Sequence, residues 1–118
     1  EWDVSKIEKM GGSSWGLFKD KTEFNADLSK WDVSRVSDLS TAFKNAVAFN
    51  ADLSLWDTSE LTTLYSSFYN AKLFNSDISK WKLKKVTSLS QTFSGAQAFN
   101  GDISTWLVGC CACLLFLN

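Results

Sequence analysis

The chain has 118 residues, a formal net charge of −1 and 45% hydrophobic residues. This length suits one domain, and the near-neutral charge gives no field that would attract nucleic acid or an anionic membrane. The chain contains no histidine, so the commonest general base and the commonest metal ligand are both missing. These features argue against a nucleic-acid-binding protein and against an enzyme.

A 25-residue repeat organises the chain. The motif F-N-x-D-[LI]-S-x-W occurs at residues 24–31, 49–56, 74–81 and 99–106. Self-similarity at such a period is typical of stacked repeat proteins. We therefore predict a single repeat domain over residues 1–118. Its coils are expected at about 2–30, 31–55, 56–80 and 81–105, with a partial coil at 106–118.

The first coil differs from the others by an insertion around residues 11–16, which are rich in glycine and serine. Such a composition predicts a surface loop. Trp15 lies at the tip of this loop. It either folds back to cover the first coil or offers a contact to a partner, and we favour the cap.

Each full repeat has two parts. Trp31, Asp32 and Val33 alternate apolar and polar residues, as a strand does. The apolar residues of the second part, at 36, 39, 43 and 46, share one face of a helix. Ser34 and Ser59 are candidate caps for these short helices. The pattern predicts an α/β fold, a right-handed solenoid with a parallel sheet on one face and short helices on the other.

The strand positions that point outward carry the candidate binding residues. Lys80, Lys82 and Lys84 form a basic ridge, with Asp57 and Asp32 one and two coils away. Leu55 and Trp15 are further candidates. The ridge is either a partner-binding face or a solvated face with weak ion pairs between strands. The sequence leaves both open.

Two polar columns are expected from the repeat: Asp27, Asp52, Asp77 and Asp102, and Asn25, Asn50, Asn75 and Asn100. A column of carboxylates could hold a cation. However, like charges one coil apart repel each other, and Asp and Asn side chains commonly bond turn backbone. We favour the turn interpretation and predict no catalytic, cofactor-binding or metal-binding residue.

The last segment is almost wholly apolar. Cys110, Cys111 and Cys113 lack the paired spacing of a zinc site, so we interpret them as small apolar residues. The run of apolar residues is too short to cross a bilayer. It either caps the last coil or docks on a partner through Leu114, Leu115, Phe116 and Leu117.

The repeat F-N-x-D-[LI]-S-x-W-D-V-S-x-V-[ST]-x-L-x-x-x-F resembles the BspA-like leucine-rich repeat of bacterial surface lipoproteins and of some microbial eukaryotes. The resemblance covers residues 1 to about 108. It implies a surface, adhesive or protein-binding module at the cell surface, and it carries no catalytic motif.

Together these patterns predict a non-catalytic protein-interaction module of the surface or adhesion type. Its partners would be proteins, with no nucleic acid and no cofactor. The alternative is a structural accessory subunit that docks in a larger assembly, with or without a membrane contact, through its apolar C-terminal end.

Overall fold

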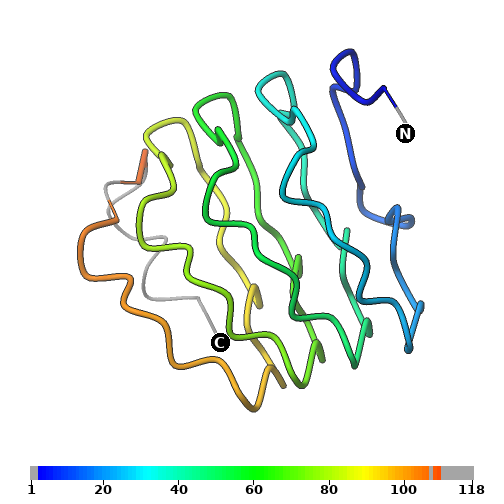
Figure 1. Ribbon diagram of the computed structural model, residues 1–118. Coiled ribbons are helices and arrows are strands. Elements are labelled where there is room, and N and C mark those ends of the chain that lie inside the picture. The colour runs from blue at the N-terminus through cyan, green and yellow to red at the C-terminus, as the bar shows by residue number, and fades with distance from the viewer. Residues whose placement is uncertain (1–2, 107, 110–118) are drawn as a thin grey trace.

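The structure is a computed structural model that describes residues 3–106 and 108–109. The chain winds in successive coils that lie side by side from the N-terminal end to the C-terminal end (Figure 1). Residues 25 apart meet in neighbouring coils. For example, the backbone N–H of Asn50 donates to Asn25 Oδ1 at 2.8 Å, and that of Asn75 donates to Asn50 Oδ1 at 2.7 Å.

Within residues 3–106 and 108–109 there is no helix and no β-sheet. Parallel pairing between coils is confined to isolated bridges, in which one residue of each coil pairs with one residue of the next. These bridges join Lys9 to Asp38, Asp38 to Thr63, Thr63 to Ser88, and Leu83 to Val108. The predicted α/β fold, a leucine-rich-repeat solenoid with a parallel sheet and short helices, is therefore wrong.

The segment predicted as a helix, residues 36–46, forms a train of turns instead. In an α-helix each backbone N–H reaches the carbonyl four residues earlier. Here every second N–H leaves its own coil, as when Phe43 donates to Ser67 O at 2.9 Å. The N–H groups between them close short turns, as when Ala46 donates to Phe43 O at 3.0 Å. Backbone bonding is thus shared between each coil and its neighbour.

Residues with positive φ separate these turns. They form two columns, one at Thr41, Ser66 and Gln91 and the other at Asp20, Asn45, Asn70 and Gly95. Single residues adopt this left-handed conformation, but a helix of L-residues does not include it. The serines predicted as helix caps serve other turns. Ser34 N–H donates to Asp32 Oδ1, and Ser59 N–H donates to Asp57 Oδ1, both at 3.1 Å.

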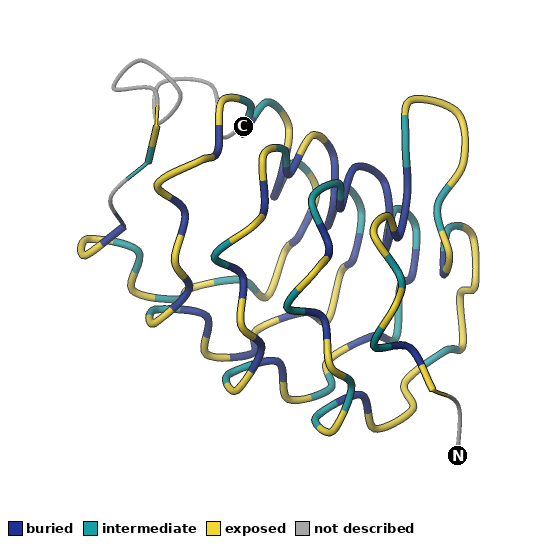
Figure 2. Cartoon of the chain, turned by 90° about the horizontal axis from the view of Figure 1, so that it is seen from above, coloured by how far each residue is buried: buried dark blue, intermediate teal, exposed yellow. Residues whose placement is uncertain are grey.

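The core is a set of aromatic columns that run across the coils. One column contains Phe18, Phe43, Phe68 and Phe93, whose ring centroids lie 5.3–5.8 Å apart. A second contains Phe24, Phe49, Phe74 and Phe99 at 5.9–6.0 Å. Figure 2 shows buried residues recurring along the inside of each coil. Stacking of rings in this range adds to the hydrophobic gain from their burial.

The tryptophans of the motif join the same core. Trp56, Trp81 and Trp106 are 4–5% exposed, so all three are buried. Each indole Nε1 donates at 3.0 Å to a carbonyl of the preceding coil, on Leu28, Leu53 and Ile78 respectively. Buried polar groups need such partners, so each tryptophan both fills the core and ties two coils together.

The insertion in the first coil is a small hairpin that lies against the second coil. Gly11 and Gly16 pair in an antiparallel bridge, and Thr41 Oγ1 donates to the carbonyls of Gly12 and Trp15 at 3.0 and 2.7 Å. A β-carbon on Gly11 would lie 1.8 Å from the Ser40 carbonyl oxygen. Glycine is therefore required for this close approach.

Gly95 provides a test of the left-handed column. Its φ is +74°, and an added β-carbon would lie 2.1 Å from Asn70 Oδ1. We expect Gly95→Ala to lower the free energy of unfolding by about 1–3 kcal/mol, because alanine is strained at this φ and displaces Asn70. Urea denaturation measures the change. Gly95→Asn should be milder, because asparagine tolerates this φ and occupies the same position at 45 and 70. Equal losses would contradict this account.

Candidate functional site

The basic ridge predicted from the sequence is exposed. Lys80, Lys82 and Lys84 are all exposed, whereas Trp81 and Leu83 between them are 4% and 1% exposed. Lys80 and Lys84 lie in short turns at the two ends of this segment, which the N–H groups of Trp81 and Val86 close. The ridge is therefore a set of exposed lysines beside two buried apolar residues.

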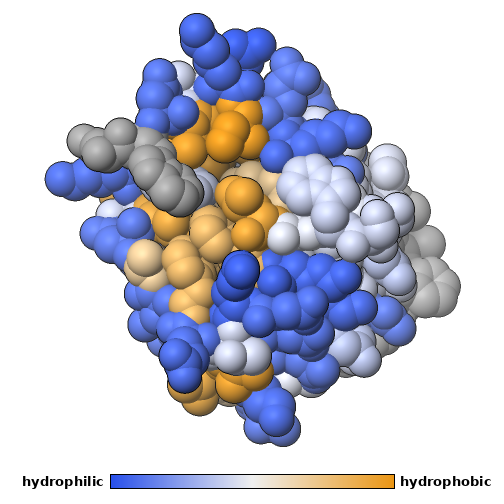
Figure 3. All heavy atoms as spheres, turned by 90° about the vertical axis from the view of Figure 1, so that its right-hand side faces the viewer, coloured by the Kyte–Doolittle hydropathy of each residue, from blue (hydrophilic) through white to orange (hydrophobic). Residues whose placement is uncertain are grey.

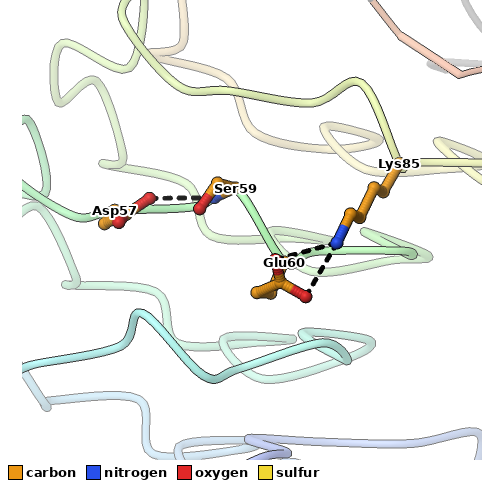
Figure 4. Close-up of polar contacts among 4 residues, drawn as sticks. All are labelled: Asp57, Ser59, Glu60 and Lys85. Atoms are coloured by element: carbon orange, nitrogen blue, oxygen red, sulfur yellow. Dashed lines mark hydrogen bonds and ion pairs between the residues drawn. The ribbon is translucent and has the colours of Figure 1, made fainter.

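Lys85 extends the ridge and forms an ion pair with the neighbouring coil. Its Nζ lies 2.8 and 2.9 Å from the two carboxylate oxygens of Glu60, and both side chains are about half exposed (Figure 4). An exposed pair of this kind contributes at most about 1 kcal/mol. Its main consequence is geometric, because it holds the Lys85 ammonium over the third coil.

A hollow of about 460 Å³ lies at the foot of the ridge. Three lysines and one glutamate form the charged part of its lining. Two buried apolar residues and two residues with hydroxyl groups form the remainder. The lining residues are Ser59, Glu60, Trp81, Lys82, Leu83, Lys84, Lys85 and Thr105. A partner side chain that enters this hollow would lie between core residues and charged residues.

The two acidic residues that the sequence analysis named as binding candidates lie in the same column as Lys82. Asp32 and Asp57 occupy the position that Lys82 has in the next coil, so this column changes sign along the stack. Hydrogen bonds from the Ser59 side chain and backbone lower the pKa of Asp57, and nearby Lys82 lowers it further. Asp57 is thus a carboxylate that is already bonded within its own turn (Figure 4).

The other two candidates lie elsewhere. Leu55 is 80% exposed at the position that Lys80 occupies one coil later, so it adjoins the ridge along the stack. Trp15 is 48% exposed on the hairpin of the first coil, with its indole beside Gly12. The hairpin contacts the second coil and the ridge lies in the fourth, so the structure does not bring Trp15 to the lysines (Figure 1).

The asparagine and aspartate columns bond the turn backbone, as predicted. The N–H of the residue two places after each aspartate donates to its Oδ1, at 2.9 Å in Asp27, Asp52 and Asp102 and at 3.0 Å in Asp77. Among the described residues no group of three or more acidic or cysteine side chains converges in a way that could hold a metal ion.

These turns predict how stability depends on pH. The pKa values of Asp3, Asp27, Asp32, Asp52, Asp57, Asp77 and Asp102 are all lowered, in each case first by the side chain and then by the backbone of the serine two residues on. A lowered folded pKa stabilises the fold above the ordinary carboxyl pKa, and this contribution is lost as the pH falls through the folded value.

We therefore expect the melting temperature to be level from neutral pH down to about pH 5 and to fall below about pH 4. Differential scanning calorimetry measures this. Asp52→Asn keeps an acceptor for Ser54 N–H but does not titrate, so it should flatten the acid slope. A melting temperature that rises on acidification would contradict the prediction.

Some residues named from the sequence lie outside the described residues. These are Cys110, Cys111, Cys113, Leu114, Leu115, Phe116 and Leu117.

Sequence reasoning also missed Glu60 as the partner of Lys85. A charge reversal between two residues 25 apart is the signal that could have found this pair. The described part of the chain has no helix that is long and apolar enough to cross a membrane.

Residues 1–106 match the family model described as "Mycoplasma protein of unknown function, DUF285". The expected assignment to the BspA-like leucine-rich-repeat family is therefore wrong, and so is the leucine-rich-repeat description of the chain. No curated protein and no solved structure matches the chain.

Proposed function

We propose that this chain, which belongs to the DUF285 family, is a non-catalytic protein-interaction module that binds an acidic partner segment across its lysine ridge. The observation that carries the proposal is the exposed set of Lys80, Lys82 and Lys84 above a hollow of about 460 Å³. The earlier expectation of a place at the cell surface depended on the leucine-rich-repeat resemblance and is not part of this proposal.

The charge of the ridge favours an acidic partner. Four lysines lie within six residues, and the acidic groups that oppose them are few: Glu60 pairs with Lys85, and Asp57 and Asp77 adjoin Lys82 and Lys80. The ridge is thus a local excess of positive charge on a chain whose net charge is −1. Such a patch steers and orients an oppositely charged partner.

The chemistry of the chain supports a binding role over a catalytic one. It contains no histidine. Seven aspartates with lowered pKa values are already occupied by serine hydrogen bonds. A pair of carboxylates that acts as acid and base needs two different environments, whereas the repeat gives these aspartates similar ones.

A labelled peptide that alternates glutamate with leucine tests the proposal by fluorescence anisotropy. We expect binding that weakens as salt is added, and a loss of at least about tenfold in affinity when Lys80, Lys82 and Lys84 are all changed to Glu. The matched control changes Lys6, Lys21 and Lys72 to Glu, three lysines that are also exposed but lie off the ridge. Equal losses in both variants, or no binding by the wild type, would contradict the proposal.

The second candidate is a structural subunit of a larger assembly. The predicted route was the C-terminal apolar run, which lies outside the described residues. The observation that favours this candidate is at the other end of the molecule, where hydrophobic residues gather on the N-terminal face (Figure 3). Exposed apolar patches of this kind commonly mark association surfaces.

A further inference from the structure

Neighbouring coils bond to each other through backbone groups that recur at fixed positions of the repeat. The N–H of Phe43 donates to Ser67 O in the next coil at 2.9 Å. In the opposite direction, the N–H of Leu73 donates to Val47 O in the preceding coil at 3.1 Å. An inner coil is therefore bonded on both of its faces.

The first coil has the same groups, but among the described residues no coil precedes it. By register with the inner coils, two carbonyls and then two N–H groups point away from the stack. They are Leu17 O, Lys19 O, Glu23 N–H and Asn25 N–H, and no hydrogen bond within the described residues uses them. Residues 17–25 therefore have the unpaired groups of a sheet edge, which readily pair with another chain.

The hairpin of the first coil limits this edge on one side. Trp15 O is the preceding carbonyl of the outward series, because Tyr65 O at the same position of a later coil accepts from Thr41 N–H. In the first coil this carbonyl is already used, since Gly12 N–H donates to Trp15 O at 2.9 Å. The open part of the edge is thus residues 17–25.

An apolar hollow lies along the same edge. It has a volume of about 560 Å³ and is lined by Leu17, Phe18, Phe24 and residues 20–23. Phe24 is half-buried, whereas Phe49, the next ring in its column, is fully buried. Figure 3 shows this face, with hydrophobic residues gathered at its centre. The edge therefore offers apolar contacts as well as backbone groups.

The Leu17 side chain points to the same side as these groups. Its equivalents Ser67 and Thr92 are fully buried, and their hydroxyls donate to Leu39 O and Leu64 O of the preceding coil at 2.8 and 3.0 Å. A side chain at this position thus reaches toward the coil before it. Leu17 is 38% exposed, because it reaches out from the first coil.

We propose that residues 17–25 are a docking edge for an extended segment of another polypeptide that has the pattern F-x-N-x-x-x-F-N of this repeat. In the register of the inner coils, the first Phe and the first Asn of the segment donate their N–H groups to Leu17 O and Lys19 O. Glu23 N–H donates to a carbonyl of the segment, and Asn25 N–H donates to the side-chain oxygen of its last Asn. Backbone bonds give such a complex affinity, and the side chains give it specificity.

Each fixed residue of this pattern has a reason in the structure. The two Phe rings of the segment enter the hollow and stack on Phe18 and Phe24, as rings of neighbouring coils do. The first Asn suits the left-handed conformation that Asn45 and Asn70 adopt at this position. The last Asn supplies the acceptor. None of these contacts involves the lysine ridge, so this docking edge is independent of the function proposed above.

A nuclear magnetic resonance titration tests the proposal. The probe is a nine-residue peptide with the sequence of residues 67–75, which contains the pattern. We expect the amide signals of Glu23 and Asn25 in the labelled chain to shift and to gain protection from hydrogen exchange, because both N–H groups acquire acceptors. If neither signal changes at about 1 mM peptide, the proposal is overturned.

Methylated peptides test the register. Methylation of the backbone nitrogens at the Phe68 and Asn70 positions removes the donors to Leu17 O and Lys19 O, so affinity should fall at least about tenfold. The matched control is methylated at the Lys72 position, whose N–H is used by no hydrogen bond within the described residues. It should bind like the unmodified peptide. Equal affinity of the two methylated peptides would contradict the proposed register.

Variants of the chain locate the site. Leu17→Lys places a charge beside the apolar hollow and should lower the affinity for the peptide at least about tenfold, with the fold checked by circular dichroism. Leu55→Lys is the matched control, since Leu55 is 80% exposed on the side of the stack. It should bind like the wild type, and so should the ridge variant with Lys80, Lys82 and Lys84 changed to Glu. A loss in the ridge variant but not in Leu17→Lys would overturn the proposal.

Discussion

The Trp56→Ala variant is expected to lose about 3–5 kcal/mol of its free energy of unfolding. Trp56 is 5% exposed in the centre of the stack, with its ring 6.2 Å from that of Trp81 and 6.3 Å from that of Phe43. Its removal leaves a cavity between two coils, and it leaves the Leu28 carbonyl without its indole donor. Urea denaturation, followed by tryptophan fluorescence and circular dichroism, measures the loss.

Trp56→Phe separates the two causes. Phenylalanine keeps most of the ring but cannot donate to Leu28 O, so we expect a smaller loss of about 1–3 kcal/mol for the unpaired carbonyl and the reduced volume. A melting temperature of Trp56→Ala equal to that of the wild type would contradict the assignment of Trp56 to the core.

Phe68→Ala should be comparably severe, with a loss of about 3–5 kcal/mol. Phe68 is fully buried. Its ring stacks on the rings before and after it in its own column and on one ring of the second column. The centroid distances are 5.3 Å to Phe43, 5.8 Å to Phe93 and 4.0 Å to Phe74. Removal therefore interrupts the stacking between three coils as well as creating a cavity.

Tyr65→Ala is the control for Phe68→Ala. Tyr65 lies three residues earlier in the same train of turns and is 39% exposed, so its truncation should cost much less. Both variants can be compared by thermal melts under one condition. Similar losses in the two variants would show that the segment, and not the aromatic column, determines the stability.

The 25-residue period predicted which residues are neighbours, but it did not predict the backbone. Apolar residues at 36, 39, 43 and 46 suit a helix, and they equally suit a train of turns that brings every third or fourth residue inward. The deciding contribution comes from the adjacent coil, which takes every second N–H of the segment. The sequence pattern of one repeat does not show whether its N–H groups bond within their own coil or to the adjacent coil. At the end of this segment Asn45 has a positive φ, as do its equivalents Asn70 and Gly95 in the next two coils.

The strand prediction failed for a related reason. The alternation at residues 31–33 and 81–83 correctly placed Val33 and Leu83 inside. However, between Thr58 and Lys82 the backbone of one coil bonds to a side chain of the other. Thr58 Oγ1 accepts from Lys82 N–H at 2.8 Å and donates to Lys82 O at 3.2 Å. A hydroxyl thus replaces a backbone partner, and a continuous ladder does not form.

The candidate site was more predictable than the backbone. Alternation alone indicated that Lys80, Lys82 and Lys84 point outward, because Trp81 and Leu83 are apolar. The hollow beside them was not predictable, since it depends on how Ser59, Glu60 and Thr105 from neighbouring coils meet residues 81–85. The repeat spacing predicts which residues are neighbours in adjacent coils. Whether those neighbours leave a hollow between them depends on how their side chains pack.

Nuclear magnetic resonance of the uniformly labelled chain tests the central claim, that residues 25 apart pack together through turns without helices. Backbone chemical shifts should show positive φ at Thr41, Asn45, Ser66 and Asn70. Ring-to-ring contacts should join Phe43 to Phe68, whose centroids lie 5.3 Å apart. A continuous run of helical chemical shifts over residues 36–46, together with no contact between these two rings, would contradict the account.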